Sequence, residues 1–313
     1  MPQQRREAAK IRTGCKINLF LNIRSLRTDG YHELQTLFYP LPMPCDNLQI
    51  LPVQGEDSCL HLHCPALPSL ANERTTLHKA LEAFNFAAGL RCSYEVWLDK
   101  RVPAGAGLGG GSANAAGFLK HLNESAGEKR LSEQQLLQIS AKIGADVPFF
   151  LMNGPALAEG IGEKLVPADI SLAGFYLVLV CPGAHVSTPW AYKEWDRLAE
   201  QGGAMENNLH AYFYQHLTSK RLTGRNSTSG SPAGKAACSW PWFYNNLEQA
   251  VFPGFPEIAA IKEALIRAGA RAALMSGSGS SVFGLFENEE SARKAVEELS
   301  FRECQTIVQV LTV

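Results

Sequence analysis

The chain has 313 residues, enough for one large or two ordinary domains with a substantial buried core. Hydrophobic residues make up 46% and charged residues 19%, which is a globular composition and excludes a disordered chain. Because 29 basic residues stand against 30 acidic ones, the net charge is −1, and we expect no nucleic-acid partner and no electrostatic attachment to a membrane. An anionic substrate must therefore be bound by local donors.

The pattern of cysteines and the length of the apolar runs indicate where in the cell the protein is found. The eight cysteines are scattered without a regular framework, a pattern typical of reduced thiols in the cytoplasm. No apolar run reaches the length that would span a bilayer as a helix. We expect a cytoplasmic protein that binds no membrane and is a monomer or a weak homodimer.

The first part of the chain reads as short strands interrupted by one helix. Apolar alternation predicts strands at 16–24, 47–53, 59–64 and 94–98, with a turn at 28–32 and a further apolar run at 34–41. The turn contains Asp-Gly, a strong turn signal. Residues 73–89 carry apolar side chains at helical spacing and predict a helix.

Helices alternate with strands in the rest of the chain as well. Ser132, with Gln135 three residues later, forms a capping box that predicts a helix ending at Gly144. The later pattern predicts strands at 175–182 and 306–313, helices at 256–270 and 289–299, and a strand, a glycine–serine turn and another strand within 273–286. Residues 218–239 are polar and rich in Ser and Gly, which predicts a mobile surface insertion. Two α+β domains are expected, 1–168 and 169–313, the second with a ferredoxin-like order of elements.

The stretch PAGAGLGGGSANAA, residues 103–116, is the most unusual in the sequence. Gly105, Gly107 and Gly110 spell G-x-G-x-x-G, but the first glycine does not directly follow a strand, and the region about twenty residues on is not a strand end with an acidic residue. A Walker loop is excluded because no Gly-Lys-Ser/Thr follows. Neither a dinucleotide site nor a P-loop is therefore favoured.

Two interpretations of this loop remain from the residues alone. A glycine-rich turn that opens a helix exposes backbone N–H groups and the positive end of the helix dipole to an anion. Lys100 and Arg101 precede it and could add positive charge. The alternative is a turn whose glycines serve packing only.

At this point the sequence resembles a known group of small-molecule kinases, the GHMP kinases, which include galactokinase, homoserine kinase and mevalonate kinase. The glycine loop is similar to their second motif, and MSGSGSSVF at 275–283 to their C-terminal glycine motif. The stretches at 16–36, 144–150, 158–163 and 245–248 resemble one branch, which phosphorylates a cytidine diphosphate derivative of methylerythritol. The resemblance covers nearly the whole chain. It implies a two-domain α+β fold with an N-terminal ATP-binding and catalytic domain, and the active site in a cleft between the domains.

The resemblance implies that ATP phosphorylates a substrate hydroxyl, with Lys16 and Asp146 as the catalytic pair. Asp146 would accept the hydroxyl proton, while Lys16 would keep Asp146 ionised and orient it. Local patterns alone would make Lys16 an edge charge on a strand and Asp146 a helix N-cap. The assignment therefore depends on the resemblance.

Further roles follow from the same resemblance. The ATP-binding residues would be Lys100, Pro103, Gly105, Gly107, Leu108, Gly109, Gly110, Gly111 and Ser112. The substrate-binding residues would be Asn18, Tyr31, His32, Tyr192, Gly277 and Gly279. Tyr31 would stack on the cytosine ring and His32 would form a hydrogen bond with it, with Tyr192 as a second aromatic contact. Mg²⁺ would arrive with ATP, with Ser112 as a candidate contact, and no dedicated metal site of the protein is expected.

Two alternatives to this function share part of the sequence pattern. Another kinase of the same family, acting on mevalonate or homoserine, fits the glycine motifs but not TDGYHELQT, which goes with cytidine recognition. A binding protein without activity on the same fold is disfavoured because both Lys16 and Asp146 are retained. CLHLHC, residues 59–64, gathers Cys and His side chains, but its spacing is not that of a structural zinc site and favours a half-exposed strand.

Overall fold

The computed structural model describes residues 8–53, 58–202, 222–223, 243–299 and 305–310. Most of the predicted insertion at 218–239 lies outside these residues; only Leu222–Thr223, the short strand β9, is described. Among the helices described, none has the length and apolar character needed to cross a bilayer.

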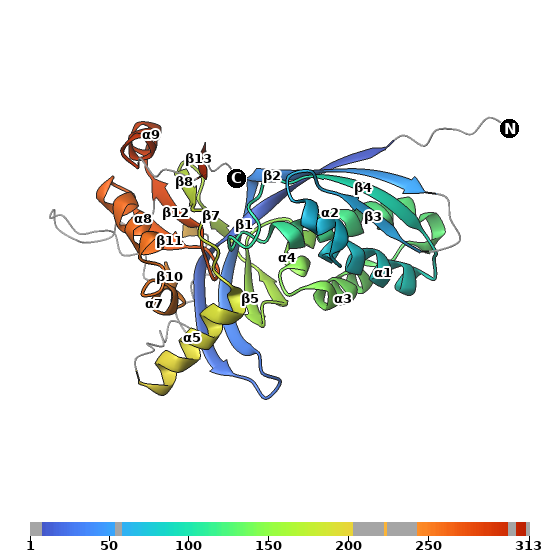
Figure 1. Ribbon diagram of the computed structural model, residues 1–313, viewed down its shortest axis with the longest axis horizontal. Coiled ribbons are helices and arrows are strands. Elements are labelled where there is room, and N and C mark those ends of the chain that lie inside the picture. Colours follow the sequence, from blue (N-terminus) through green and yellow to red (C-terminus); the bar gives the residue numbers. More distant parts are fainter. Residues whose placement is uncertain (1–7, 54–57, 203–221, 224–242, 300–304, 311–313) are drawn as a thin grey trace. The chain divides into compact units, whose positions relative to one another are not determined.

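The described residues form helices and strands in mixed order (Figure 1). The helices are α1 (Thr76–Ala88), α2 (Gly110–Ser125), α3 (Glu133–Ile143), α4 (Val147–Leu151), α5 (Thr188–Glu200), α7 (Glu248–Val251), α8 (Pro256–Arg267) and α9 (Glu289–Glu298), with short 3-10 turns η1 (Pro68–Asn72) and η2 (Gly127–Lys129). The strands are β1 (Ala9–Leu26), β2 (His32–Val53), β3 (Leu60–His63), β4 (Ser93–Asp99), β5 (Ala156–Gly160), β6 (Lys164–Pro167), β7 (Ile170–Ser171), β8 (Tyr176–Cys181), β9 (Leu222–Thr223), β10 (Tyr244–Asn245), β11 (Ala272–Met275), β12 (Val282–Phe286) and β13 (Gln305–Val310).

The chain divides into two compact units, and both are discontinuous in sequence. The first unit comprises residues 1–16, 40–104 and 109–153, and the second comprises 17–39, 105–108 and 154–313. The strands β1 and β2 and the glycine loop each contribute residues to both units. The predicted single boundary at 168 stays a prediction.

In the first unit, β3, β4 and the end of β2 are neighbouring strands of a sheet that helices cover on one face. β4 pairs antiparallel with the end of β2, from Asn47 opposite Asp99 to Val53 opposite Ser93, and parallel with β3. The helices α1, α2, α3 and α4 share one core with this sheet, and α3 and α4 pack against α1 and α2 (Figure 1). In α1, Leu77, Leu81 and Phe84 are buried in the shared core, as their helical spacing predicted.

In the second unit, β11, β12, β8 and β13 form an antiparallel sheet in that order. The strand predicted at 175–182 is confirmed as β8, which is apolar on both faces because both are covered. The predicted helix at 256–270 is confirmed as α8, with Ile258, Ile261 and Leu265 buried in the core of this unit. The hairpin of β1 and β2 around the Asp-Gly turn also belongs to this unit, where β2 pairs with β5 and β1 with β10.

One difference from the sequence-based expectation concerns β2. Two separate apolar runs were expected between 34 and 53, but the structure has one strand, His32–Val53. Its two ends pair with different strands, 34–38 with β5 and 47–53 with β4. Pro40, Pro42 and Pro44 fall between these two pairings, where their missing N–H groups interrupt neither ladder.

Candidate active site

Lys16 and Asp146 form an ion pair within the first unit. Nζ of Lys16 lies 3.6 Å from Oδ2 of Asp146, and the side chains are 5% and 31% exposed. Asp146 occupies the position before α4, where an N-cap would stand, but its side chain makes no capping hydrogen bond. The carboxylate is therefore directed to the lysine and not to the helix backbone, which local sequence patterns did not reveal.

Burial perturbs the lysine of this pair. Desolvation lowers the pKa of the Lys16 ammonium below its ordinary value, and the nearby Asp146 carboxylate opposes that shift. A buried ammonium beside a carboxylate produces a strong local electric field, because little water screens its charge. Such a pair can hold a proton acceptor ionised and fixed in orientation.

The glycine loop ends at the start of α2, close to this pair. Gly109 has φ +68° and forms the N-cap of α2, a left-handed conformation that glycine adopts without cost. A Cβ on Gly109 would lie 3.2 Å from Cγ of Lys16, so the lysine stem runs along the loop. The N–H groups of Gly110, Gly111 and Ser112 form the first turn of a 16-residue helix, where no intrahelical carbonyl is available to them. Anions are stabilised at such a helix end.

The glycines of the loop do not all serve the same purpose. A Cβ on Gly107 (φ +76°) would lie only 2.0 Å from the carbonyl oxygen of Ser276, in the second unit. By contrast, a Cβ on Gly111 would meet nothing closer than Oγ1 of Thr76 at 3.6 Å, an ordinary contact. Packing within the protein therefore explains Gly107, whereas Gly111 is exposed and leaves space in front of its backbone.

The remaining loop residues that we expected at the ATP site differ in exposure. Pro103 and Ser112 are half-buried, Leu108 is buried, and Gly105 is exposed, with φ +68° and its α-carbon beside the imidazole of His185. Gly110 packs against Val102, because a Cβ there would lie 2.8 Å from Cγ1 of that valine.

Lys100 is engaged in a buried network rather than extended into solvent. Its Nζ lies 2.7 Å from Oδ2 of Asp46, and the two side chains are 8% and 0% exposed. Asp46 also accepts hydrogen bonds from the backbone N–H groups of Arg101 and Val102 and from Nδ2 of Asn114. Asp46 thus ties the chain before the glycine loop to α2. Sequence reasoning missed it, because nothing in its neighbourhood of the sequence marks it.

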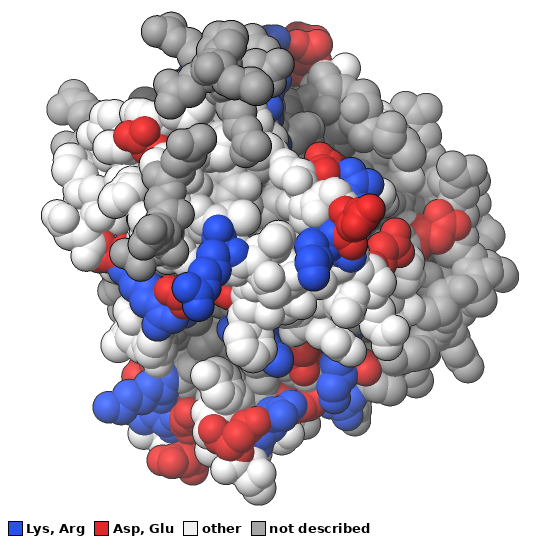
Figure 2. All heavy atoms as spheres, turned by 90° about the vertical axis from the view of Figure 1, so that its right-hand side faces the viewer, with Lys and Arg blue, Asp and Glu red and all other residues white. Residues whose placement is uncertain are grey.

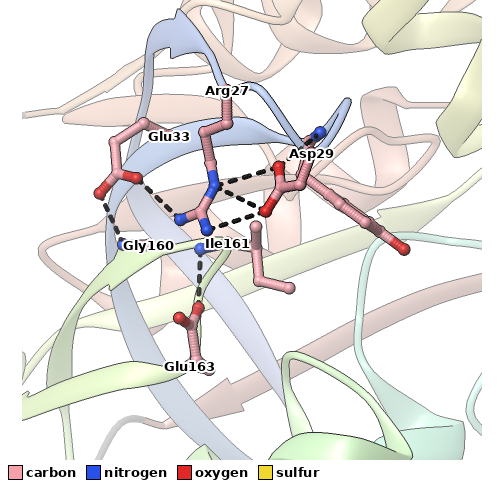
Figure 3. Close-up of polar contacts among 7 residues, drawn as sticks. Arg27, Asp29, Glu33, Gly160, Ile161 and Glu163 are labelled. Atoms are coloured by element: carbon pink, nitrogen blue, oxygen red, sulfur yellow. Dashed lines mark hydrogen bonds and ion pairs between the residues drawn. The ribbon is translucent and has the colours of Figure 1, made fainter.

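Tyr31 lies at the tip of the β1–β2 hairpin and is 61% exposed. The turn is closed by hydrogen bonds from the N–H of Arg27 to the carbonyl of Tyr31 and from the N–H of Tyr31 to Oδ1 of Asp29. Figure 3 shows the guanidinium of Arg27 between the carboxylates of Asp29 and Glu33, and Glu33 accepting the N–H of Gly160 at 3.1 Å. This network ties the β1–β2 turn, which carries Tyr31, to the β5–β6 turn.

His32 follows on β2 and is contacted by α5. Its Nε2 lies 2.6 Å from Oδ1 of Asp196, and its ring stacks on Tyr192 with centroids 5.0 Å apart. The structure therefore brings two of the predicted substrate-binding residues, His32 and Tyr192, into direct contact. Asp196 was not foreseen from the sequence.

The second glycine motif lies against Asn18 and Gly107 in the second unit. Oγ of Ser276 accepts the N–H of Asn18 at 3.3 Å and donates to the carbonyl of Gly107 at 3.0 Å. Gly277 (φ +58°) and Gly279 (φ +87°) both adopt left-handed conformations. Three predicted residues, Asn18, Gly107 and Gly277, are thus neighbours.

Asn245 holds this second motif in shape. Its Nδ2 donates to the carbonyls of Met275 and Gly277, at 2.8 and 2.7 Å. Glu248 accepts the N–H of Met275, and burial raises the pKa of its carboxyl, although Lys262 opposes the shift. Both residues lie in the NNLE stretch, which carried a family resemblance but no assigned role.

Charges of both signs are mixed on one face of the described residues (Figure 2). On the face shown in Figure 2, Lys and Arg side chains lie among Asp and Glu side chains, and neither sign forms a continuous patch. In CLHLHC, His63 interacts with Glu95 at 2.8 Å and stacks on Trp97, as a half-exposed strand residue does.

Comparison with known proteins identifies the family. The model of the GHMP kinases N terminal domain matches residues 75–154, and that of the GHMP kinases C terminal domain matches 223–303. Solved structures with the same fold include a homoserine kinase from Cytophaga hutchinsonii, with a TM-score of 0.66 and 19% identity over 100% of this chain and 97% of that one. The expected two-domain α+β fold of these kinases is thereby confirmed.

More similar proteins belong to one branch of these kinases. A 4-diphosphocytidyl-2-C-methyl-D-erythritol kinase of Oleidesulfovibrio alaskensis is 42% identical over 95% of this chain and 94% of its own length. The relative of the same name from Lawsonia intracellularis is 37% identical over 96% of both chains. A crystal structure of 4-(cytidine 5'-diphospho)-2C-methyl-D-erythritol kinase has 32% identity and a TM-score of 0.71, over 96% of this chain and 98% of that chain. The chain therefore belongs to the GHMP kinases and, among them, to the family of 4-diphosphocytidyl-2-C-methyl-D-erythritol kinases.

Proposed function

We propose that this ATP-dependent kinase transfers the γ-phosphoryl group of ATP to the 2-hydroxyl of 4-diphosphocytidyl-2-C-methyl-D-erythritol, a step of the non-mevalonate route to isoprenoid precursors. The similarity to kinases named for this substrate, over nearly the full length of both chains, supports the substrate. The ion pair between Lys16 and Asp146 is the observation that supports the chemistry, because it supplies an oriented carboxylate next to a helix N-terminus.

In this mechanism Asp146 accepts the proton of the attacking hydroxyl. Lys16 keeps the carboxylate ionised through its positive charge and also stabilises charge on the transferred phosphoryl group. Phosphoryl transfer asks little covalent chemistry of a protein, so positioning and charge stabilisation dominate. A base in this position contributes about 10²–10⁴-fold to the rate.

The phosphates of ATP lie at the start of α2. Exposed N–H groups at Gly110, Gly111 and Ser112 and the helix dipole favour an anion there. Ser112 would be the candidate contact for Mg²⁺ brought with ATP, and the ion would neutralise part of the charge on the phosphates. Lys100 acts mainly through its pair with Asp46, which fixes the chain that leads into the loop.

The cytosine end of the substrate binds at the β1–β2 hairpin. Tyr31 is exposed and held by a rigid turn, as a stacking platform for a base requires. His32 forms a hydrogen bond with the base, and Tyr192, stacked on His32, adds a second aromatic surface. Asn18, Gly277 and Gly279 contact the methylerythritol and diphosphate parts.

A substrate panel tests this function. The protein is incubated with ATP, Mg²⁺ and one alcohol at a time: the cytidine diphosphate substrate, mevalonate or homoserine. ADP release is expected with the cytidine compound alone. Turnover of mevalonate or homoserine would contradict the substrate assignment, and no turnover with any alcohol would favour a binding protein without activity.

A further inference from the structure

The imidazole of His32 is held by two side chains from one face of α5. Tyr192 and Asp196 are four residues apart on this helix and therefore project from the same side. The ring of Tyr192 stacks on the imidazole with the planes inclined by 28°, and Asp196 lies 2.6 Å from Nε2. In Figure 1, α5 lies beside the hairpin of β1 and β2. Next to them, Ala191 and Trp195 are buried in the core, which seats the helix.

The contact with Asp196 determines which ring nitrogen carries the hydrogen. An ionised carboxylate only accepts hydrogen bonds, so Nε2 of His32 is the donor. In the neutral imidazole, Nδ1 is then an acceptor with a lone pair. Among the described residues His32 makes no second hydrogen bond, which leaves Nδ1 available to a ligand.

Because the side chain of His32 is largely buried, its Nδ1 can discriminate between ligand groups that donate a hydrogen bond and groups that accept one. The His32 side chain is 9% exposed, so a ligand group that failed to match Nδ1 would leave a buried polar atom unpaired. Cytosine presents an exocyclic amino group, a donor, at the position where uracil presents a carbonyl oxygen, an acceptor. An acceptor at Nδ1 therefore matches cytosine and repels uracil. Sites built around such a hydrogen bond discriminate far better than apolar pockets do.

We propose that Asp196 is a specificity-determining positioning residue: by holding the hydrogen of His32 on Nε2, it makes Nδ1 the acceptor that selects cytosine over uracil. The inference rests on the proposed function, in which His32 contacts the base. Asp196 itself does not touch the substrate in this account, since it acts through the histidine.

The substitution Asp196→Asn tests the proposal, because an amide can either accept from or donate to Nε2 and no longer fixes the tautomer. Steady-state kinetics are measured with the cytidine substrate and with its uridine analogue. The ratio of the two kcat/KM values should fall by about 10-fold or more, mainly through a higher KM for the cytidine substrate. The KM for ATP should not change, and Asp196→Glu, which restores a carboxylate, should recover part of the ratio. An unchanged ratio in Asp196→Asn would overturn the proposal.

Nitrogen NMR of histidine-labelled protein gives a readout that a purely structural role would not move. In the neutral imidazole of His32, the wild type should show the hydrogen on Nε2. Asp196→Asn should shift this population towards Nδ1. Finding the hydrogen on Nδ1 in the wild type would overturn the proposal.

Two further variants separate this proposal from the proposed function. Glu200→Gln removes an exposed carboxylate from the same helix and should leave the base preference unchanged. Tyr31→Ala should raise the KM for the cytidine substrate if the hairpin binds the base at all. If Tyr31→Ala raises this KM while Asp196→Asn leaves the base preference intact, the base site stands and the role of Asp196 is refuted. If neither variant has an effect, the base site itself is wrong.

Discussion

At the scale of single residues, the proposed chemistry depends on the burial of Lys16, which weakens the screening of its charge by water. Lys16 is 5% exposed and faces the more accessible carboxylate of Asp146. The lowered pKa of Lys16 means that desolvation outweighs the attraction of that carboxylate. Asp146 is 31% exposed, which under the proposed function leaves its carboxylate accessible to a substrate hydroxyl. Burying the lysine of this pair adds little to the stability of the fold, because the desolvation penalty offsets the attraction between the two charges.

The titration of Lys16 is a direct prediction at this scale. Above its lowered pKa the lysine is neutral, so kcat/KM, which reports the free enzyme, should fall as pH rises through a value below the ordinary lysine range of about 10.4. Carbon NMR of labelled lysine ε-carbons, assigned with Lys16→Met, measures the midpoint. In Asp146→Asn the midpoint should move still lower, because the opposing carboxylate is lost. A midpoint at or above that of exposed lysines would refute the assigned environment.

At the scale of elements, the glycine motifs are positioned by the rest of the protein. Asp46 holds the entry to the loop, Ser276 ties the second motif to Gly107, and Asn245 binds the carbonyl of Gly277 within that motif. The glycines of the loop differ in whether they make room for a ligand or for neighbouring backbone. Gly107 serves packing, whereas Gly111 has open space before it.

Alanine substitutions separate these two roles. Gly107→Ala forces a Cβ to 2.0 Å from the Ser276 carbonyl at φ +76°, so the free energy of unfolding should fall by at least about 1–2 kcal/mol, the usual cost of left-handed backbone alone. Gly111→Ala is the matched control: thermal unfolding should be unchanged or slightly raised, because alanine favours a helix. In kinetics it should raise the KM for ATP. Equal Tm values for the two variants would contradict the assignment of packing to Gly107 and of open space to Gly111.

At the scale of the whole molecule, the sequence predicted much of the secondary structure and the family, but not the long-range contacts. Periodicity located α1, α8 and β8, and the capping box located the start of α3 at Ser132. Asp46 and Asp196 were missed because their partners, Lys100 and His32, lie 54 and 164 residues away. The single long strand β2 was missed because prolines interrupt its pattern, and the strand is continuous through its pairing with β1, β5 and β4.

The transfer of phosphate to one hydroxyl is the central claim, and product analysis tests it most directly. The wild type and Asp146→Asn are each mixed with ATP, Mg²⁺ and the cytidine substrate, and the product is followed by phosphorus NMR with couplings that locate the new ester. The wild type should form one phosphate monoester, at the 2-hydroxyl, with one ADP released for each. Asp146→Asn should bind ATP with unchanged Kd and form the same ester about 10²–10⁴-fold more slowly. Phosphate on another hydroxyl, or near-normal kcat in Asp146→Asn, would contradict the account.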